Sequence, residues 1–427
     1  MCHRTATLTS AVVVFVALVA APASADTHVV LANGSGDFPN VQAAIDAATG
    51  GDIIELGDGT FDGVGNRDID FSGKAITIRS QSDDPSACVF ELGATQSVPY
   101  RGFIFQSGEG ASSVLRGVTV SNGYVYITSG EEEGGGGILC DSSSPTIENC
   151  IIGSNTTDGT VPTYGGGILC RGISHPTITG CYFVNNEASM SNAGCGGALA
   201  CLSGAGATIY ATTLNANYAG DAGGGAYCDG ADVTFDDCTI NDNGAADAAG
   251  VYMEEGTYNL TGCTLLWNEA TGTGVGGAIL AATGAYTISG CTIMGNLAAS
   301  EGGGIFFSSQ ASGQLTNSIV AYSLMGGGIY LDSPDRPLPL AVSCCDVFEN
   351  TGGDYVGGMP DQTGMNDNIS LEPKFCDAPA GDVTIYDTSP CAPANSPCGF
   401  QIGAEGVDCL DSPVEEKSWG GIKSTYE

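Results

Sequence analysis

Two adjacent carboxylates, Asp236 and Asp237, are the residues of this sequence whose spacing first suggests acid–base chemistry. Hydrolysis of a glycosidic bond needs two carboxyl groups that face one another across the bond, ~5 to 9.5 Å apart. The surrounding pattern predicts that Asp236 lies on the outward face of a strand and Asp237 at a bend, so their side chains diverge. We therefore assign no catalytic set and retain Asp236 as the single catalytic candidate.

Basic residues are scarce, and this limits the ligands that the chain could accept. The sequence has 11 Lys and Arg against 48 Asp and Glu, a formal net charge of −37. Between Arg116 and Arg336 the only Arg or Lys is Arg171. Such a chain has no basic surface with which to bind nucleic acid. It also has few cations with which to hold an anionic polysaccharide.

Acidic side chains recur once in most repeats, and they raise the question of a metal site. Stacked at one edge, their oxygens could hold Ca²⁺, with Asp221, Asp247 and Glu269 as the candidate ligands. The alternative is a solvated acidic edge, because no Asp-x-Asp-x-Asp loop occurs. No zinc site is expected, since no pair of Cys-x-x-Cys motifs stands at finger spacing. Apart from this possible Ca²⁺, we expect no cofactor.

Cysteine is frequent, at 18 residues, and much of it follows the repeat. Stacked strands lie ~4.8 Å apart, which would permit disulfides. Side chains in register on parallel strands point the same way, however, and this favours buried thiols that pack as small apolar groups. The two ladders are Cys150, Cys181, Cys238, Cys263 and Cys291, and Cys140, Cys170, Cys201 and Cys228.

Four further cysteines lie near the end of the chain, the last three of them in a Pro- and Gly-rich stretch. They are Cys376, Cys391, Cys398 and Cys409. We predict that they form two disulfides that close the last turn of the fold. Three pairings are possible, and the sequence does not separate them.

A repeat with a period of 25 to 32 residues places all these groups. Each copy reads apolar-x-x-Cys-x-apolar-x-x-Asn after a Gly-rich stretch. The cysteine position is inward, as is the apolar position two residues later, since strands alternate their faces with period two. The apolar position three residues earlier has the opposite parity, so the chain must bend between them. The predicted bend residues are Gly117, Asn149, Gly180, Ala211, Asp237, Gly262, Gly290, Asn317 and Cys344.

Five residues after the cysteine position the repeat carries a second polar column. It predicts a stacked asparagine ladder at another corner, formed by Asn155, Asn186, Asn217, Asn243, Asn268, Asn296 and Asn350. Repeats of this length cannot bury a face alone and therefore stack into a solenoid. A parallel β-helix fits three short strands and corner asparagines per turn. The predicted fold class is an all-β, single-stranded parallel β-helix solenoid.

The repeat also divides the chain. Residues 111–350 are the regular repeats, and residues 26–110 form an N-terminal cap with the first turns. In that cap Val41, Ala44, Ile45 and Ala48 share one helical face after Asn40, a candidate N-cap, which predicts a capping helix. Residues 351–410 form a Cys-rich closing segment, and residues 411–427 form a tail that either attaches the protein to a surface or docks on the exit end.

Residues 1–25 predict a secretory signal peptide that is cleaved after Ala25. Basic residues precede an apolar run, and small residues follow it. A membrane anchor is the alternative, but the run is shorter than the ~20 residues that a span needs. No other stretch is long and apolar enough to cross a bilayer. We expect a secreted or cell-surface protein, in a compartment where disulfides persist.

The opening of the predicted cap, with Pro39, Val41, Gly51-Asp52 and Gly59-Thr60-Phe61, resembles that of pectin-lyase-like, right-handed parallel β-helix proteins. The later Gly-Gly-Ala-Ile and apolar-x-x-Asn copies resemble the repeats of bacterial polymorphic outer-membrane proteins. The resemblance covers roughly Asn33 to Asn350 and implies a right-handed solenoid. It implies no single activity, because the superfamily mixes lyases, hydrolases, esterases and non-catalytic surface proteins.

Enzymes of this kind carry motifs that the chain largely lacks. Of the polygalacturonase-type motifs only Asp-Asp occurs, and no pectate-lyase or pectinesterase set is present. We therefore expect an exported bacterial surface or extracellular protein that acts as a non-catalytic binding or adhesion scaffold for a glycan or a protein. The alternative is a carbohydrate-active enzyme, a polysaccharide lyase or glycoside hydrolase, with Asp236 as its candidate residue.

Overall fold

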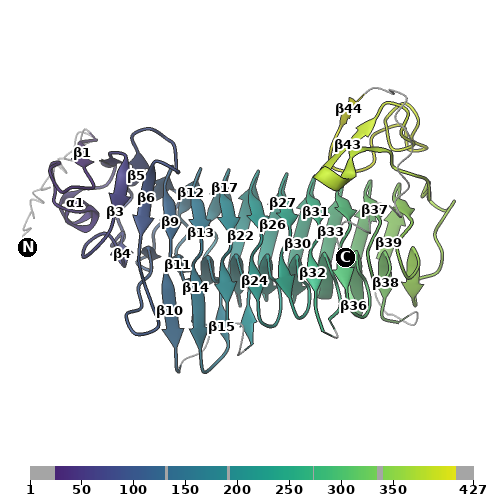
Figure 1. Cartoon of the computed structure of the whole chain (residues 1–427), viewed down its shortest axis with the longest axis horizontal. Helices are drawn as coiled ribbons and strands as arrows, with labels where there is room; N and C mark the ends of the chain where they lie inside the picture. Colours follow the sequence, from purple (N-terminus) through teal and green to yellow (C-terminus); the bar gives the residue numbers. More distant parts are fainter. Residues whose placement is uncertain (1–24, 130–132, 190–192, 273, 334–339, 410–427) are drawn as a thin grey trace, which may run out of the picture.

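Short parallel strands separated by sharp bends make up most of the chain, and they stack into a solenoid of about 11 turns (Figure 1). The computed structural model describes residues 25–129, 133–189, 193–272, 274–333 and 340–409. The tail 411–427 and residues 1–24 of the predicted signal peptide lie outside these residues. The all-β parallel solenoid expected from the repeat is confirmed.

Sheet 1 is the largest sheet, with 21 strands in the described part of the chain. Most turns contribute two strands to it, one from the Gly-rich stretch and one that leads to the bend. Its strands are β1 Thr27–Val30, β2 Ile53–Leu56, β4 Ile69–Asp70, β5 Thr77–Ser80, β7 Phe103–Phe105, β8 Val114–Arg116, β11 Ile138–Asp141, β12 Thr146–Glu148, β16 Ile168–Arg171, β17 Thr177–Thr179, β21 Leu199–Leu202, β22 Gly206–Tyr210, β25 Ala226–Asp229, β26 Asp232–Asp236, β29 Val251–Glu254, β30 Gly256–Thr261, β33 Ile279–Ser289, β36 Ile305–Thr316, β38 Ile329–Leu331, β39 Leu340–Ser343 and β41 Tyr355–Gly357.

Sheets 2 and 3 form the other walls, with one strand per turn. Sheet 2 consists of β3 Gly59–Phe61, β6 Cys88–Glu91, β9 Thr119–Ser121, β13 Ile151–Gly153, β18 Tyr182–Val184, β23 Thr213–Asn215, β27 Thr239–Asn241, β31 Thr264–Leu266, β34 Thr292–Met294, β37 Ile319–Ala321 and β40 Asp346–Phe348. Sheet 3 consists of β10 Tyr124–Ile127, β14 Thr156–Gly159, β19 Glu187–Ala188, β24 Tyr218–Ala219, β28 Gly244–Ala245, β32 Glu269–Ala270 and β35 Leu297–Ala298. A small pair, β15 Thr163–Tyr164 and β20 Gly194–Cys195, lies beside sheet 3.

The bend predicted before each cysteine position is confirmed. All nine residues have positive φ angles, from 47° at Ala211 to 66° at Gly117. A single left-handed residue reverses the parity of the strand, so that apolar side chains on both sides of it point inward. As a result both predicted apolar columns are buried throughout, for example Ile147 and Ile152 in one turn.

The corner asparagines form a buried ladder between sheets 2 and 3. The Nδ2 group of Asn186 donates to Oδ1 of Asn217 at 3.0 Å, and that of Asn217 donates to Oδ1 of Asn243 at 3.0 Å. Each amide also donates to a backbone carbonyl of the preceding turn, as Asn217 does to Phe183 at 3.1 Å. Because buried polar groups need partners, this chain of bonds fixes the register of the turns.

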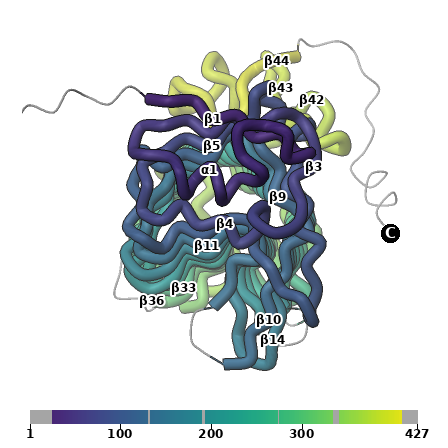
Figure 2. Tube along the Cα trace, turned by 90° about the vertical axis from the view of Figure 1, so that its left-hand side faces the viewer, coloured from purple at the N-terminus to yellow at the C-terminus, as the bar shows by residue number. Residues whose placement is uncertain are grey.

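A short helix, α1 Val41–Ala47, covers the N-terminal end of the solenoid, as Figure 2 shows from that end. Oδ1 of Asn40 accepts a bond from the backbone N–H of Ala43 at 2.9 Å, which confirms Asn40 as the N-cap. Val41, Ala44 and Ile45 are buried against the first turns. The helix thus shields core side chains that would otherwise face solvent.

The C-terminal segment lies alongside the solenoid and not over its last turn (Figure 1). It contains β42 Phe375–Asp377, the 3₁₀ helix η1 Ala378–Ala380, β43 Asp382–Tyr386 and β44 Val407–Cys409. Its core residues, among them Val383, Ile385 and Ile402, pack with outward side chains of sheet 2, among them Leu266 and Met294. Several outward positions of sheet 2 are apolar in these late turns, and this explains where the segment docks.

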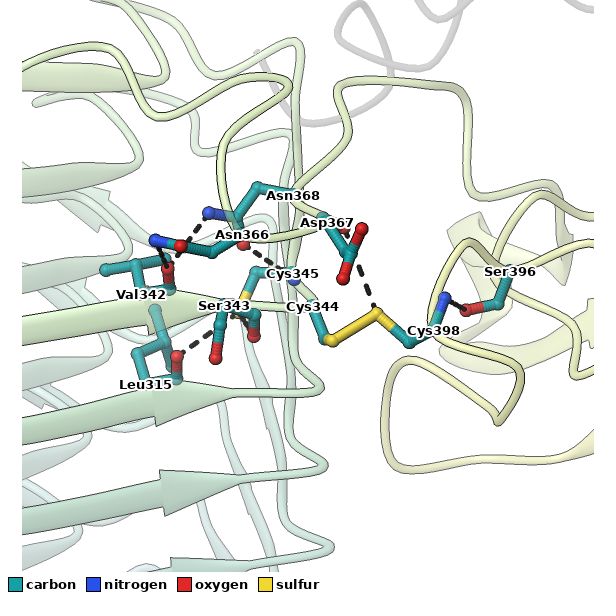
Figure 3. The surroundings of a disulfide bond; sticks show 10 residues. All are labelled: Leu315, Val342, Ser343, Cys344, Cys345, Asn366, Asp367, Asn368, Ser396 and Cys398. Carbon is teal, nitrogen blue, oxygen red and sulfur yellow. Dashed lines mark hydrogen bonds between the residues drawn. A yellow bond between two sulfur atoms is a disulfide. The ribbon is translucent and has the colours of Figure 1, made fainter.

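The disulfides correct the sequence interpretation. Cys376 pairs with Cys409, but Cys398 pairs with Cys344, a bend residue of the solenoid (Figure 3). Cys391 remains a buried thiol. Only one of the two predicted pairs therefore forms within the set of four, because docking on sheet 2 brings Cys398 to the corner that holds Cys344. The ladder cysteines are free, buried thiols as well.

Asp346 is a buried acid at the junction between sheet 2 and the C-terminal segment. Its Oδ2 accepts a bond from Sγ of Cys391 at 3.1 Å, and its Oδ1 accepts one from the N–H of Leu371 at 3.0 Å. Burial raises the pKa of Asp346 from 3.8 to about 6, and the charge of Asp354 adds to this. Asp346 thus stays neutral up to a higher pH in the folded protein than in the unfolded chain.

Replacement of Asp346 by asparagine is expected to stabilise the protein at pH 7.5 and to have little effect at pH 4. A folded pKa above the unfolded one gives stability that is present below pH 3.8 and is lost as the pH rises through about 6. At ~1.4 kcal/mol per pKa unit, the difference amounts to at most ~3 kcal/mol. Urea unfolding of both proteins at the two pH values measures it. An equal stability difference at both pH values would contradict the prediction.

Candidate functional site

Asp236 lies on an outward position of β26, where the sequence places it. Its register neighbours on the adjacent strands are Tyr210 and Thr261. Asp237 occupies the bend with a φ of 55°. Asp237 is exposed at that bend, and neither register neighbour of Asp236 is a second acid. The geometry does not form the facing pair that glycoside hydrolysis requires.

The calcium candidates lie along one edge but do not converge. Asp221 and Asp247 are neighbours in adjacent turns, and burial together with the charge of Asp247 raises the pKa of Asp221. Oδ1 of Asp247 accepts the N–H of Val275 at 3.0 Å, and Glu269 is exposed on β32. Among the residues that the structure describes, the only three metal-ligating groups within 4.8 Å of one another are Cys344, Asp367 and Cys398. Two of these are joined in a disulfide, so they offer no thiolate.

A continuous apolar column on the outer face of sheet 1 is the largest feature that the sequence interpretation missed. It follows the Gly-rich strands, one residue per turn, with every neighbour in register. We call it the outer strip. Its residues are Ile104, Leu139, Leu169, Ala200, Tyr227, Tyr252, Leu280, Phe306, Tyr330 and Val356.

A signal for the outer strip was present in the sequence. Ile138 and Cys140 point inward, so alternation requires Leu139 between them to point outward. A strand with one solvated face would carry a polar residue there. Apolar residues at this position in successive turns therefore mark an outer face that serves as an interaction site.

The outer strip is closed over its first turns and more open afterwards. Leu139, Leu169 and Ala200 are buried, and Tyr164 of β15 packs over them. From Tyr227 onward most members are partly exposed. The strip thus reaches solvent over the second half of the solenoid.

Aromatic rings dominate the open part of the strip. The rings of Tyr227 and Tyr252 stack with their centroids 4.8 Å apart, and those of Phe306 and Tyr330 stack at 5.0 Å. Burial raises the pKa of both Tyr227 and Tyr252, and both stay protonated as hydrogen-bond donors. The Tyr252 hydroxyl donates to Oε2 of Glu254 at 2.6 Å. The strip therefore combines apolar rings with polar groups beside them.

Acidic residues accompany the open strip. Asp229 and Glu254 are the next outward positions on β25 and β29, and they are register neighbours. The corresponding position on β16 is Arg171, which pairs with Asp141 at 2.9 Å. The electrostatic surroundings of Tyr227 and Tyr252 are thus negative. A polyanion would be repelled from this part of the face.

An open cleft of about 490 Å³ lies at the N-terminal end of the strip. Ile104, the first strip residue, is one of its lining residues. The cleft also contains an arginine, two tyrosines and two carboxylates. The lining residues are Asp68, Pro99, Tyr100, Arg101, Ile104, Val125, Tyr126, Ile127, Thr128, Ser129 and Glu133.

Comparison with protein-family models agrees with the architecture. The family model for the right-handed β-helix region matches residues 160–293. Among solved structures, the crystal structure of pectate lyase Pel9A is similar to 90% of this chain and 97% of that chain, with a TM-score of 0.45 and 13% sequence identity. No curated protein sequence gives a significant match. In the described residues, no helix has the length and apolar character needed to span a membrane.

Proposed function

We propose that this chain, a right-handed parallel β-helix of the pectin-lyase-like type, is an exported scaffold without catalytic activity. Its proposed ligand is a glycan without net negative charge. The glycan would lie along the open part of the outer strip. The single observation that carries the proposal is the register of apolar and aromatic side chains on an outward face. Elongated ligands match such a surface, because each turn offers the same kind of contact as the turn before it.

The chemistry of the strip supports a sugar ligand. Sugar rings present C–H groups and hydroxyls together, and Tyr side chains combine an apolar ring with a polar tip. Asp229 and Glu254 supply acceptors for hydroxyl groups beside the rings of Tyr227 and Tyr252. Their charges, with the net charge of −37, favour a neutral or amino-bearing glycan over a uronic-acid polymer.

The alternative of a carbohydrate-active enzyme has less support. Asp236 lies between Tyr210 and Thr261, and no other candidate acid occupies a facing position in that column. Export is supported by the predicted signal peptide and by the two disulfides, since such bonds persist in oxidising compartments. Retention at the cell surface would use residues beyond the solenoid.

The double variant Tyr227→Ala/Tyr252→Ala is expected to weaken glycan binding by a factor of ten or more. The two rings would contribute ~1.4 kcal/mol or more between them, which is a tenfold change in Kd. Affinity electrophoresis against β-glucan, galactomannan, xylan and starch, with polygalacturonate as the anionic control, measures the effect. Tyr182→Ala is the matched control, because this tyrosine is exposed on sheet 2, away from the strip.

Two results would contradict this function. Unchanged binding by the double variant would remove the strip as the ligand face. Turnover of any of these polymers that Asp236→Asn abolishes would make the protein an enzyme instead.

A further inference from the structure

The cleft at the N-terminal end of the outer strip differs from the rest of the strip in its charge. In and around it, the three basic residues Arg67, Arg101 and Arg171 stand among the four acids Asp68, Asp70, Glu133 and Asp141. Three neighbouring arginines are a local concentration of positive charge in a chain with 11 Lys and Arg. A ligand that enters the cleft therefore meets both hydrogen-bond donors and acceptors.

Arg101 is the donor in the cleft wall. Its side chain is only 20% exposed, and its Nε donates to the carbonyl of Gly134 at 3.1 Å. Its Nη2 lies 3.8 Å from Oε2 of Glu133, beyond hydrogen-bond distance. Glu133 instead binds Arg171 more closely, with 3.0 Å between Oε1 and Nη1. Burial also lowers the pKa of Arg101.

The terminal nitrogens of Arg101 are thus held in place while they keep hydrogen-bonding capacity. Within the described residues, no hydrogen bond engages Nη1 or Nη2 of Arg101. A planar guanidinium that is fixed at Nε can donate two parallel bonds to a ligand. Neighbouring hydroxyls of a sugar ring provide acceptors at this kind of spacing, and Asp68 supplies a carboxylate in the same cleft.

Aromatic rings complete the cleft. The guanidinium of Arg67 lies 3.7 Å from the centroid of the Tyr100 ring, which fixes that ring by a cation–π contact. Tyr126 of β10 also lines the cleft and is partly exposed. Ile104 and Ile127 supply apolar wall. An aromatic surface together with fixed polar groups is typical of a binding site for a small polar ligand.

The outer strip ends at this cleft. On β4, the register neighbour of Ile104 is Asp70, so the next position of the column is a carboxylate. Nε2 of Gln106 donates to Oδ2 of Asp70 at 2.8 Å, and this polar pair stands where the next apolar contact would be. The buried residues Leu139, Leu169 and Ala200 lie between this cleft and the open part of the strip, so the cleft is a separate subsite at the N-terminal end of the column.

We infer that the cleft is an end subsite, in which Arg101 and Tyr126 bind the terminal units of an uncharged saccharide. This inference rests on the proposed function and adds a second mode of recognition to it. Short oligosaccharides depend on the cleft, because they cannot span enough turns of the strip. Long polymers bind mainly along the open strip, with many internal units in contact.

The test compares short and long saccharides on matched variants. Cellohexaose, mannohexaose, xylohexaose and maltohexaose are titrated by calorimetry, and the corresponding polymers by affinity electrophoresis. Arg101→Lys keeps the charge but removes the planar fork, and Tyr126→Ala removes the ring. Each substitution is expected to weaken the affinity for the hexasaccharide that binds about tenfold. The affinity for the polymer should change less than threefold. Arg116→Lys is the control, since Arg116 pairs with Asp83 and Glu148 outside the cleft.

The outcomes separate the two ideas. Polymer binding that depends on Tyr227 and Tyr252, together with hexasaccharide affinity that Arg101→Lys and Tyr126→Ala leave unchanged, would overturn the end subsite and keep the proposed function. Loss of polymer and hexasaccharide affinity to the same extent in the cleft variants would contradict the inference that short saccharides bind in the cleft and long polymers bind mainly along the open strip. If neither hexasaccharides nor polymers bind the unaltered protein, both ideas fail.

Discussion

Asn217→Ala is expected to lower the free energy of unfolding by about 3 to 5 kcal/mol, because the buried ladder cannot replace this amide. Oδ1 of Asn217 accepts bonds from the N–H and the Nδ2 group of Asn186, at 3.0 Å each. Its own Nδ2 donates to the carbonyl of Phe183 and to Asn243. Alanine leaves these groups without partners in a site that is 1% exposed. Urea unfolding followed by circular dichroism measures the loss.

Asn215→Ala provides the matched control for that experiment. Asn215 is two residues away on β23 and is only partly buried, and its side chain lies outside the ladder. A loss below about 1 kcal/mol is expected there, as for other substitutions near a protein surface. A similar loss of unfolding free energy at both positions would mean that the ladder contributes no more to stability than a partly buried surface residue does.

Loss of the Cys344–Cys398 disulfide is expected to weaken docking of the C-terminal segment by about 4 kcal/mol. The bond closes a loop with a sequence separation of 54, and the chain-entropy cost of opening such a loop is of this order. In Cys398→Ser, the segment keeps its apolar contacts with sheet 2 but loses its covalent link. Hydrogen exchange of β43 and limited proteolysis of residues 370–409 report the undocking.

Cys391→Ser is the control for the disulfide variant, since Cys391 is a buried thiol that makes no disulfide. Its hydroxyl can still donate to Asp346, so docking should change by less than about 1 kcal/mol. Exchange rates for β43 that are the same in Cys398→Ser and in the unaltered protein would contradict the expected role of the disulfide.

Features that depend on local periodicity could be predicted from the sequence. The bend residues and both inward columns follow from strand parity. The predicted bend at Asp237 already argued against a catalytic pair of Asp236 and Asp237. The outer strip was missed because its members sit inside short apolar runs such as Ile138 to Cys140, where an outward residue resembles a core residue. The recurrence of an apolar residue at the outward position becomes clear only when every turn is aligned on the Gly-rich strand.

Features that depend on contacts between distant segments could not be predicted. Cys344 occupies a bend position in the repeat, and nothing local distinguishes it from Asn317 one turn earlier. Its pairing with Cys398 follows from the docking of the C-terminal segment on Leu266, Met294 and their neighbours. The cleft likewise joins residues of different turns, among them Arg101 and Tyr126, through loops whose course the repeat does not specify.

The two disulfides also determine how the solenoid would carry a mechanical load. A pull on the chain beyond Cys409 passes through Cys409 to Cys376, and through Cys398 to Cys344. The second path delivers force to a corner of the coil, between β39 and β40. The segment from residue 345 to residue 375 lies in parallel with that path and is relieved of part of the tension. Tension applied from the C-terminal side would therefore load a crosslinked corner, and the final turn would not be the first to peel away.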